Sequence, residues 1–380
     1  MTDTTVIGLE AAEAQSLASG AIGNAVLAVE LAHNTGQWAN AKRFIQQVAG
    51  GPIDAGSHSG LFYGAPAIAF LLYLTGTGRY ERARQQLQRH VSRLIHTRLL
   101  AADERIRQRR ATAFAEYDLL YGLTGLGALL LEHAPGCDEL GDILAYTVRL
   151  VQPQHNDGVE LPGWWVEHDP DSLIPTPGGH ANLGMAHGAG GLLALLSLAA
   201  QRGIQVDGQY EAIGWLCAWF DRWQYDTAAG TFWPQWLTAD DVRSGRVNHV
   251  RQSRPSWCYG AVGIARAQQL AALATGDPGR QSRAERVLAG CLDPAEVARL
   301  TEAGICHGRA GLYQTAYRAA QDAADPRIAE RLPYLAALVS PETGANTGLL
   351  NGSEGVGLVQ HSIGTGEPPR TRWDTCLLIV

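Results

Sequence analysis

Seven apolar stretches recur along the chain, and a short glycine-containing motif comes just before each of them. The motif is Gly-x-x-Gly in six copies and Gly-x-x-Ala in the second, and the copies begin at residues 20, 64, 122, 188, 260, 308 and 352. The stretches, such as "LLALLSLAA" (192–200), are apolar nearly all round, which is typical of buried helices. This self-similarity predicts a repeat architecture.

Amphipathic stretches lie between the apolar ones, and their apolar residues recur every three or four positions. They cover residues 81–100, 209–223, 280–292 and 327–339. Each repeat unit is therefore predicted to be a helix pair, with one buried inner helix and one outer helix that has a solvent-exposed face.

Seven helix pairs can form an open solenoid or a closed ring. The chain ends lack the polar capping repeats that an open solenoid requires, so we predict an all-α fold, an α/α toroid, as a single domain over residues 1–380. The seven inner helices would begin at the glycine motifs, at one end of the ring. Glycine allows tight turns and close backbone contacts there, and packing alone is a sufficient reason for most of these glycines.

Two segments, 155–184 and 225–255, interrupt the repeat and are rich in glycine, proline and tryptophan. We predict long loops here, with at most a short hairpin. Long loops in a compact domain are often functional, and each of these leads directly into a glycine motif that carries polar residues.

Composition narrows the class of protein. With 46% hydrophobic residues, the 380-residue chain can bury a large core, and its net charge of −7 argues against nucleic acid as a partner. The N-terminal residues lack the features of a signal peptide, and the longest apolar runs are about half the ~20 residues that span a bilayer. We therefore expect a soluble cytoplasmic protein, whose six cysteines are no disulfide framework.

Cys258 comes just before the fifth glycine motif, and Cys306 and His307 come just before the sixth. The repeat would bring these turns to adjacent places on one end of the ring. Zn²⁺ binds thiolate and imidazole ligands tetrahedrally, and three protein ligands leave one position open, as in catalytic sites. The spacing is not specific by itself, so two buried cysteines without a metal are the alternative.

Other polar residues fall at the same end of the ring. His187 stands directly before the fourth motif, Asp118 stands four residues before the third, and Arg254 and Tyr259 flank Cys258. Each has a structural explanation: a helix cap for His187 or Asp118, a surface ion pair for Arg254, and the core for Tyr259. Their convergence on one rim is what indicates a functional site.

Taken together, "AHGAGG" (186–191), "SWCYGAVG" (256–263) and "CHGRAG" (306–311) within a sevenfold repeat resemble the lanthionine synthetase C family, the lanthipeptide cyclases. The resemblance covers nearly the whole chain and implies an α/α toroid with a zinc ion near its centre. The zinc ligands that it implies are Cys258, Cys306 and His307, with water at the fourth position. The residues that match the catalytic positions of the family are His187, Asp118 and Arg254, with Tyr259 in a supporting role.

The resemblance also implies a reaction. A zinc-bound peptide thiolate would add to a dehydroalanine or dehydrobutyrine of the same peptide, closing a (methyl)lanthionine thioether ring. Arg254 would stabilise the enolate. His187 would move protons, and Asp118 would either orient His187 or share the proton transfer. The expected partners are a dehydrated precursor peptide with leader and core, a separate dehydratase, and through these a membrane-associated biosynthetic complex. A small β domain, which a family member carries as an insert, is expected to be absent or reduced because little strand pattern is visible.

Three other functions fit parts of the pattern. A cyclase-like protein that adds glutathione to dehydrated residues would share the zinc ligands. A terpene cyclase or prenyltransferase would share the toroid, but Asp240-Asp241 lacks the context of an acidic metal motif. A zinc-containing peptide-binding protein without catalysis would not need an open coordination position.

Overall fold

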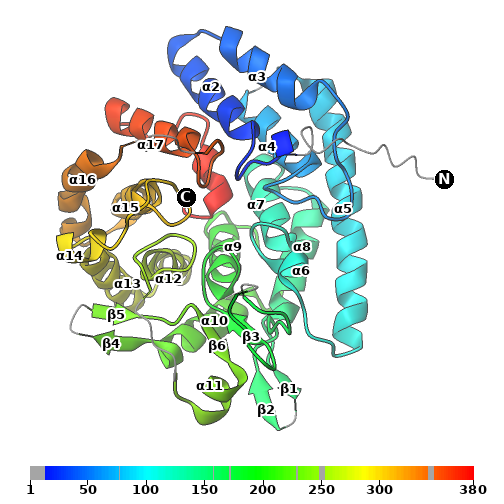
Figure 1. Ribbon diagram of the computed structural model, residues 1–380. Coiled ribbons are helices and arrows are strands. Elements are labelled where there is room, and N and C mark those ends of the chain that lie inside the picture. The colour runs from blue at the N-terminus through cyan, green and yellow to red at the C-terminus, as the bar shows by residue number, and fades with distance from the viewer. Residues whose placement is uncertain are drawn as a thin grey trace.

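The computed structural model describes residues 13–76, 78–156, 158–170, 173–227, 230–247, 253–340 and 346–380. Seven inner helices form a ring (Figure 1). They are α2 (Ile22–Thr35), α4 (Ala65–Leu74), α7 (Leu123–His133), α9 (Ala189–Gln201), α12 (Ala261–Thr275), α15 (Arg309–Asp322) and α17 (Ser353–Thr365). Each packs against the next in this order, and α17 packs against α2, so the ring is closed. The predicted α/α toroid is confirmed.

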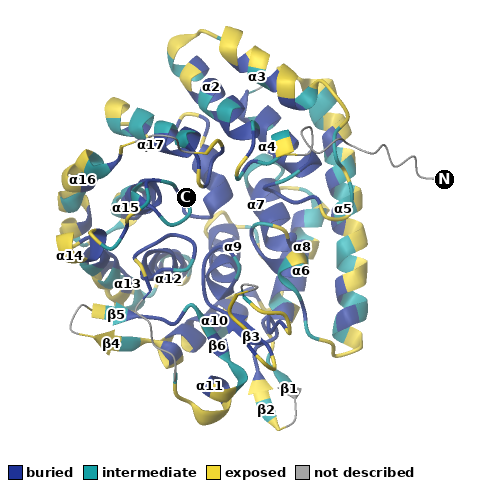
Figure 2. Cartoon of the chain, in the orientation of Figure 1, coloured by how far each residue is buried: buried dark blue, intermediate teal, exposed yellow. Residues whose placement is uncertain are grey.

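The outer layer consists of helices that pack against the inner helix preceding them in the chain. They are α3 (Ala39–Ala49), α5 (Glu81–Arg107), α8 (Asp138–Leu150), α10 (Gln209–Trp223), α13 (Pro278–Cys291) and α16 (Pro326–Leu338). Figure 2 shows the division predicted from the sequence: inner helices α4, α7, α9 and α12 are buried along nearly their whole length, whereas the outer helices expose one face. Inner helices α2 and α17 are only partly buried.

The prediction of seven complete helix pairs is wrong for the last pair, because no outer helix follows α17 in the described residues. Residues 372–380 instead turn into the centre of the ring (Figure 1), where they include the short 3-10 helix η1 (Trp373–Leu377). We call this segment the C-terminal plug. Its side chains from Trp373 to Ile379 are buried, so the plug fills the space that seven apolar helices leave between them.

Polar groups fix the C-terminal plug inside the ring. The buried carboxylate of Asp374 accepts hydrogen bonds from Arg318 Nε (2.6 Å) and Nη2 (2.9 Å) on α15 and from Gln314 Nε2 (2.6 Å). On α12, the buried guanidinium of Arg266 donates to the carbonyl oxygen of Ile379 at 3.1 and 2.9 Å. Arg266 also forms an ion pair with Asp322 at 2.7 Å. Each of these buried charges is therefore paired, as its removal from water requires.

The glycines of the repeat are explained by close backbone contacts at the helix starts. A Cβ atom on Gly311 would lie 1.8 Å from the carbonyl oxygen of Ile305, and one on Gly263 would lie 2.0 Å from that of Trp257. No side chain fits at these distances. The turn before each of these helices therefore folds back onto the first helical turn, and this turn carries the polar residues singled out above.

The two predicted loop segments contain short strands. Residues 157, 171–172, 228–229 and 248–252 of these segments lie outside the described residues. The strands are β1 (Gln154–Asn156), β2 (Val159–Leu161), β3 (His180–Asn182), β4 (Tyr225–Thr227), β5 (Gly230–Phe232) and β6 (Trp236–Thr238). Pairs β1–β2 and β4–β5 are hairpins, and the antiparallel pair β3–β6 joins one loop segment to the other. No sheet in the described residues exceeds two strands, and the expectation of an absent or reduced β insert stays a prediction.

Three short helices complete the described elements. They are α6 (Phe114–Tyr117), α11 (Ala239–Ser244) and α14 (Pro294–Val297). Among the described residues, none of the helices combines the length and the apolar character that crossing a bilayer demands.

Candidate metal centre and the surrounding rim

The turns that precede the inner helices are joined to one another by backbone hydrogen bonds. The bonds run from Leu119 N to Ala186 O (3.1 Å), from Ala186 N to Cys258 O (3.2 Å), from Cys258 N to Cys306 O (3.2 Å), from Cys306 N to Leu350 O (2.9 Å) and from Leu350 N to Ala18 O (3.0 Å). We call these joined turns the rim. The rim satisfies backbone groups that would otherwise be buried unpaired, and it brings residues distant in the sequence into direct contact.

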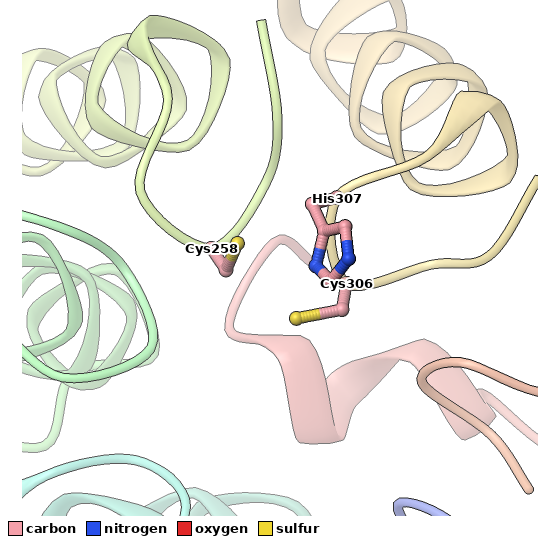
Figure 3. Close-up of side chains that lie close together, drawn as sticks. All are labelled: Cys258, Cys306 and His307. Atoms are coloured by element: carbon pink, nitrogen blue, oxygen red, sulfur yellow. The ribbon is translucent and has the colours of Figure 1, made fainter. Parts of the chain in front are cut away.

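Cys258, Cys306 and His307 meet on the rim (Figure 3). Their ligand atoms all lie within 4.8 Å of one another, and they are the one group of His, Cys, Asp and Glu side chains in the described part of the chain that is arranged to hold a metal ion. Cys258 is 2% exposed, whereas Cys306 and His307 are half-buried. Solvent therefore reaches the cluster through Cys306 and His307 rather than through Cys258.

The donor set fits Zn²⁺. Bond lengths of about 2.3 Å to sulfur and 2.0–2.1 Å to nitrogen place tetrahedral donor atoms roughly 3.5–3.8 Å apart. The three donors, all within 4.8 Å of each other, need only a small contraction to reach that geometry. Three protein ligands and one open position are the arrangement of catalytic rather than structural zinc sites.

The protein environment already favours a thiolate in this cluster. The hydrogen bond from the Cys306 thiol, more than any other interaction, lowers the pKa of Cys258 to about 5, and the neighbouring His307 contributes in the same direction. The same contact raises the pKa of Cys306. The pKa of His307 is raised, first by its hydrogen bond with Cys258. A thiolate is the form of cysteine that binds metal.

His187 and Asp118 form a second group on the rim. The Nδ1 atom of His187 lies 2.5 Å from Oδ2 of Asp118, whose side chain is fully buried. The other carboxylate oxygen, Oδ1, accepts the backbone N–H groups of Tyr121 (2.6 Å) and Gly122 (3.0 Å) at the start of α7. Burial raises the pKa of Asp118, while the hydrogen bond with His187 opposes this rise. Asp118 thus both caps the turn and orients the imidazole.

Aromatic rings surround the imidazole of His187. The ring centroids of Phe114, Tyr259 and Tyr121 lie 4.9, 5.6 and 5.9 Å from it, all within 28° of parallel. The hydroxyl of Tyr117 donates to the carbonyl oxygen of His187 at 2.7 Å. Tyr121 remains 50% exposed. The imidazole is therefore fixed in orientation, and one aromatic wall of the site is free to contact a ligand.

Arg254 makes the surface ion pair that was one of its two interpretations. Its Nη1 lies 3.2 Å from Oε1 of Glu302, and both side chains are close to half exposed. Glu302 also contacts the cluster, because its Oε2 lies 2.5 Å from Nε2 of His307. Arg254 is thus connected to the cluster through a carboxylate that sequence reasoning did not identify.

The structure places all seven predicted site residues on the rim, and their roles stay predictions. Cys258, Cys306 and His307 form one cluster, Asp118 and His187 form a hydrogen-bonded pair, and Tyr259 stacks on that pair. The sequence analysis missed Phe114, Tyr121 and Glu302. The only signal for Glu302 was its position within four residues of Cys306, which is too common to be informative.

Comparisons with known proteins identify relatives of the chain. The curated relative "Nisin biosynthesis protein NisC" from Lactococcus lactis subsp. lactis is 24% identical over 206 residues, which is 52% of this chain and 48% of the relative, so the match spans about half of the relative's length. The solved structure of "Nisin cyclase" superposes with a TM-score of 0.81 at 20% identity and covers 97% of this chain and 93% of that one, which shows a shared fold. The family model for "Lanthionine synthetase C-like protein" matches residues 12–378. The chain therefore belongs to the lanthionine synthetase C-like family.

Proposed function

We propose that the protein is a zinc-dependent lanthipeptide cyclase, which closes thioether rings in a peptide by intramolecular Michael-type addition of cysteine thiols to dehydroalanine or dehydrobutyrine. The observation that carries the proposal is the joint presence on one rim of a three-ligand cluster and a buried Asp118–His187 pair. Tyr259 links the two groups, since it follows Cys258 in the chain and stacks on His187. Family membership supports the same activity.

The metal would be held by Cys258, Cys306 and His307. Bound there, Zn²⁺ would lower the pKa of a substrate thiol and keep it as a thiolate near neutral pH. The half-buried side of the cluster, where Cys306 and His307 reach the surface, is where a peptide gains access. The chain's part is to hold two thiolate ligands, whose negative charge leaves the substrate sulfur nucleophilic.

Proton transfer is assigned to His187. When its Nδ1–H donates to Asp118, its Nε2 is free to accept the thiol proton and to return a proton to the substrate later. In the addition itself, the sulfur forms a bond to the β-carbon and the π electrons of the alkene move onto the α-carbon and its carbonyl as an enolate. One proton on the α-carbon completes the product, so the thiol supplies every atom that is added.

Charge stabilisation is assigned to Arg254. The enolate that forms on addition is an oxyanion, and a positioned guanidinium stabilises such charge more in the transition state than in the ground state. Arg254 extends from the rim turn that also carries Cys258, and its guanidinium is about half exposed. A substrate can therefore reach it without unfolding any element of the ring.

The partners follow from the reaction. Its substrate is a precursor peptide whose serines and threonines have already lost water, so a separate dehydratase has to act first. The proposed site of action is the cytoplasm, in a biosynthetic complex that is brought to the membrane by its other members. Glutathione as the thiol donor is the alternative that the same site chemistry allows.

The test uses the purified protein, added zinc and its dehydrated precursor peptide. We expect free peptide thiols to disappear at a rate well above that without enzyme. Alkylation of the remaining thiols and mass spectrometry measure this loss. His187→Ala should retain zinc and lose most of this rate, because positioned acid–base groups contribute about 10²–10⁴ in rate. Unchanged peptide thiols in the presence of zinc-loaded protein would refute the proposal, and addition of free glutathione in their place would favour the alternative.

A further inference from the structure

Glu302 uses its two carboxylate oxygens for two different partners. Oε2 lies 2.5 Å from Nε2 of His307, and Oε1 lies 3.2 Å from Nη1 of Arg254. An ordinary exposed ion pair between Arg254 and Glu302 contributes little to stability, so that pair alone gives no reason for this arrangement. A carboxylate that holds an imidazole on one side and a guanidinium on the other has the geometry of a bridge.

The backbone of Glu302 is fixed in place by the start of α15. Its carbonyl oxygen accepts the N–H group of Arg309, the first residue of α15, at 3.0 Å. A Cβ atom on Gly308 would lie 2.6 Å from the same oxygen, so the glycine is what allows the turn to close over the helix. The carboxylate is therefore presented from a constrained turn, close to the cluster.

The contact with Glu302 decides which nitrogen of His307 is available for a metal. With Nε2 committed to the carboxylate, Nδ1 is the remaining donor, and Figure 3 shows one ring nitrogen turned toward Cys258 and the other turned away. Histidines that bind metals generally donate their other ring N–H to a carboxylate or carbonyl, which fixes the tautomer and makes the imidazole a stronger ligand. Glu302 is the group placed to do this.

We propose that Glu302 is a positioning residue, which fixes His307 with Nδ1 toward Cys258 and Cys306 and at the same time anchors Arg254 beside the metal centre. The inference rests on the proposed function, because it requires that the cluster binds zinc. It extends that function by assigning a role to a residue outside the ligand set, and it links the metal centre to the cation that would stabilise the enolate.

Zinc affinity of the full-length protein is the primary test, measured by competition with a chromophoric chelator. Replacing a carboxylate that supports a ligand histidine typically weakens metal binding by about 10–100-fold, and we expect this for Glu302→Ala. Glu302→Gln should give an intermediate loss, since the amide keeps an acceptor oxygen but not the charge. Glu302→Asp should recover part of the affinity if the shorter carboxylate still reaches Nε2.

The matched control is Asp293→Asn. Asp293 forms an ion pair with Arg331 at 2.9 Å, and its exposure is similar to that of the Glu302 pair, but it is paired on the outer side of the protein. This variant should bind zinc like the wild type. Arg254→Met should also keep most of the affinity, because Arg254 contacts the far oxygen of the carboxylate.

A spectroscopic measurement separates positioning from a general loss of structure. In zinc-loaded protein with ¹⁵N-labelled histidine, we expect the signals of His307 to show a metal-bound Nδ1 and a protonated Nε2, and the Nε2–H signal to shift in Glu302→Gln. The melting temperature of the metal-free variants should match that of Asp293→Asn.

Two results would overturn the role of Glu302. One is zinc binding by Glu302→Ala, or by the isosteric Glu302→Gln if the alanine variant does not fold, that is as tight as in Asp293→Asn. The other is metal bound through Nε2 of His307. A wild-type protein that takes up no zinc would instead refute the metal centre on which both proposals depend, so the two failures are distinguishable.

Discussion

Asp118→Asn tests the assignment of proton transfer with the least structural change. The amide oxygen can still accept the N–H groups of Tyr121 and Gly122, so the hydrogen bonds of the turn before α7 are retained. The amide nitrogen, however, then faces Nδ1 of His187, which has to become an acceptor. The proton moves to Nε2, and the imidazole loses the lone pair with which it would take up the thiol proton.

The expected magnitudes differ for rate and stability. Loss of a positioned base costs about 10²–10⁴ in rate. The lost hydrogen bond to a charged group costs roughly 1.5–3 kcal/mol. Removal of a buried carboxylate, whose pKa is raised by burial, offsets part of this cost. We therefore expect the free energy of unfolding to fall by no more than about 2 kcal/mol. Asp118→Ala leaves the backbone N–H of Tyr121 without its acceptor, which costs roughly 1–3 kcal/mol, while the N–H of Gly122 keeps the backbone carbonyl oxygen of Asp118 at 3.1 Å.

The assay compares initial cyclisation rates, zinc content and unfolding free energies on the same preparations. Asp240→Asn is the control, because Asp240 is an exposed carboxylate on α11 that pairs only locally with Arg243. A rate in Asp118→Asn above about a third of the wild-type rate would contradict the role of Asp118, because a missing base should lower the rate by about 10²–10⁴. Loss of zinc in this variant would mean that Asp118 acts on the metal centre instead.

Three further outcomes are expected. Replacing any one of the three cluster residues by alanine should remove most of the bound zinc, as measured by metal analysis after dialysis, and full occupancy in two such variants would contradict the ligand set. Burial lowers the pKa of His180 to about 4. Between pH 6.5 and 4 only the unfolded chain takes up this proton, so acidification over this range should lower the free energy of unfolding by roughly 3 kcal/mol. Urea unfolding of His180→Phe at a series of pH values should lack this component. Asp374→Ala leaves the buried guanidinium of Arg318 unpaired and should cost about 3–5 kcal/mol of unfolding free energy, whereas a cost below 1 kcal/mol would mean that water replaces the carboxylate.

The ring could be predicted from the sequence because its determinants are local. Most inner helices are apolar nearly all round, and their glycines are required by the turn that precedes the helix, as Gly311 is against Ile305. The amphipathic segment 209–223 coincides with α10 for the same reason. The last unit could not be predicted, since residues 372–380 are apolar enough for a helix and only the space inside the ring determines that they become a plug.

The site could be predicted only where the sequence places polar residues beside a glycine motif. Cys258 and His187 stand out in that way, whereas Glu302 and Phe114 acquire meaning only through contacts with residues of other segments. The pairing of β3 with β6 was equally hidden, because strands of three residues show no alternation and the two are separated by a helix pair. Non-local contacts of this kind leave no trace in a single sequence.

Residues 372–380 can take their place in the ring only after all seven inner helices have left the ribosome. The indole N–H of Trp257, next to Cys258, donates to the carbonyl oxygen of Leu377 at 3.0 Å across 120 positions of the chain, and Arg372 pairs with Glu132 across 240 positions. Contacts between such distant residues form late, because closing the long loop between them costs entropy before the contact contributes any stabilisation. The turn that carries Cys258 is therefore completed only once residues 372–380 have been synthesised, and we expect zinc to be acquired by the closed ring.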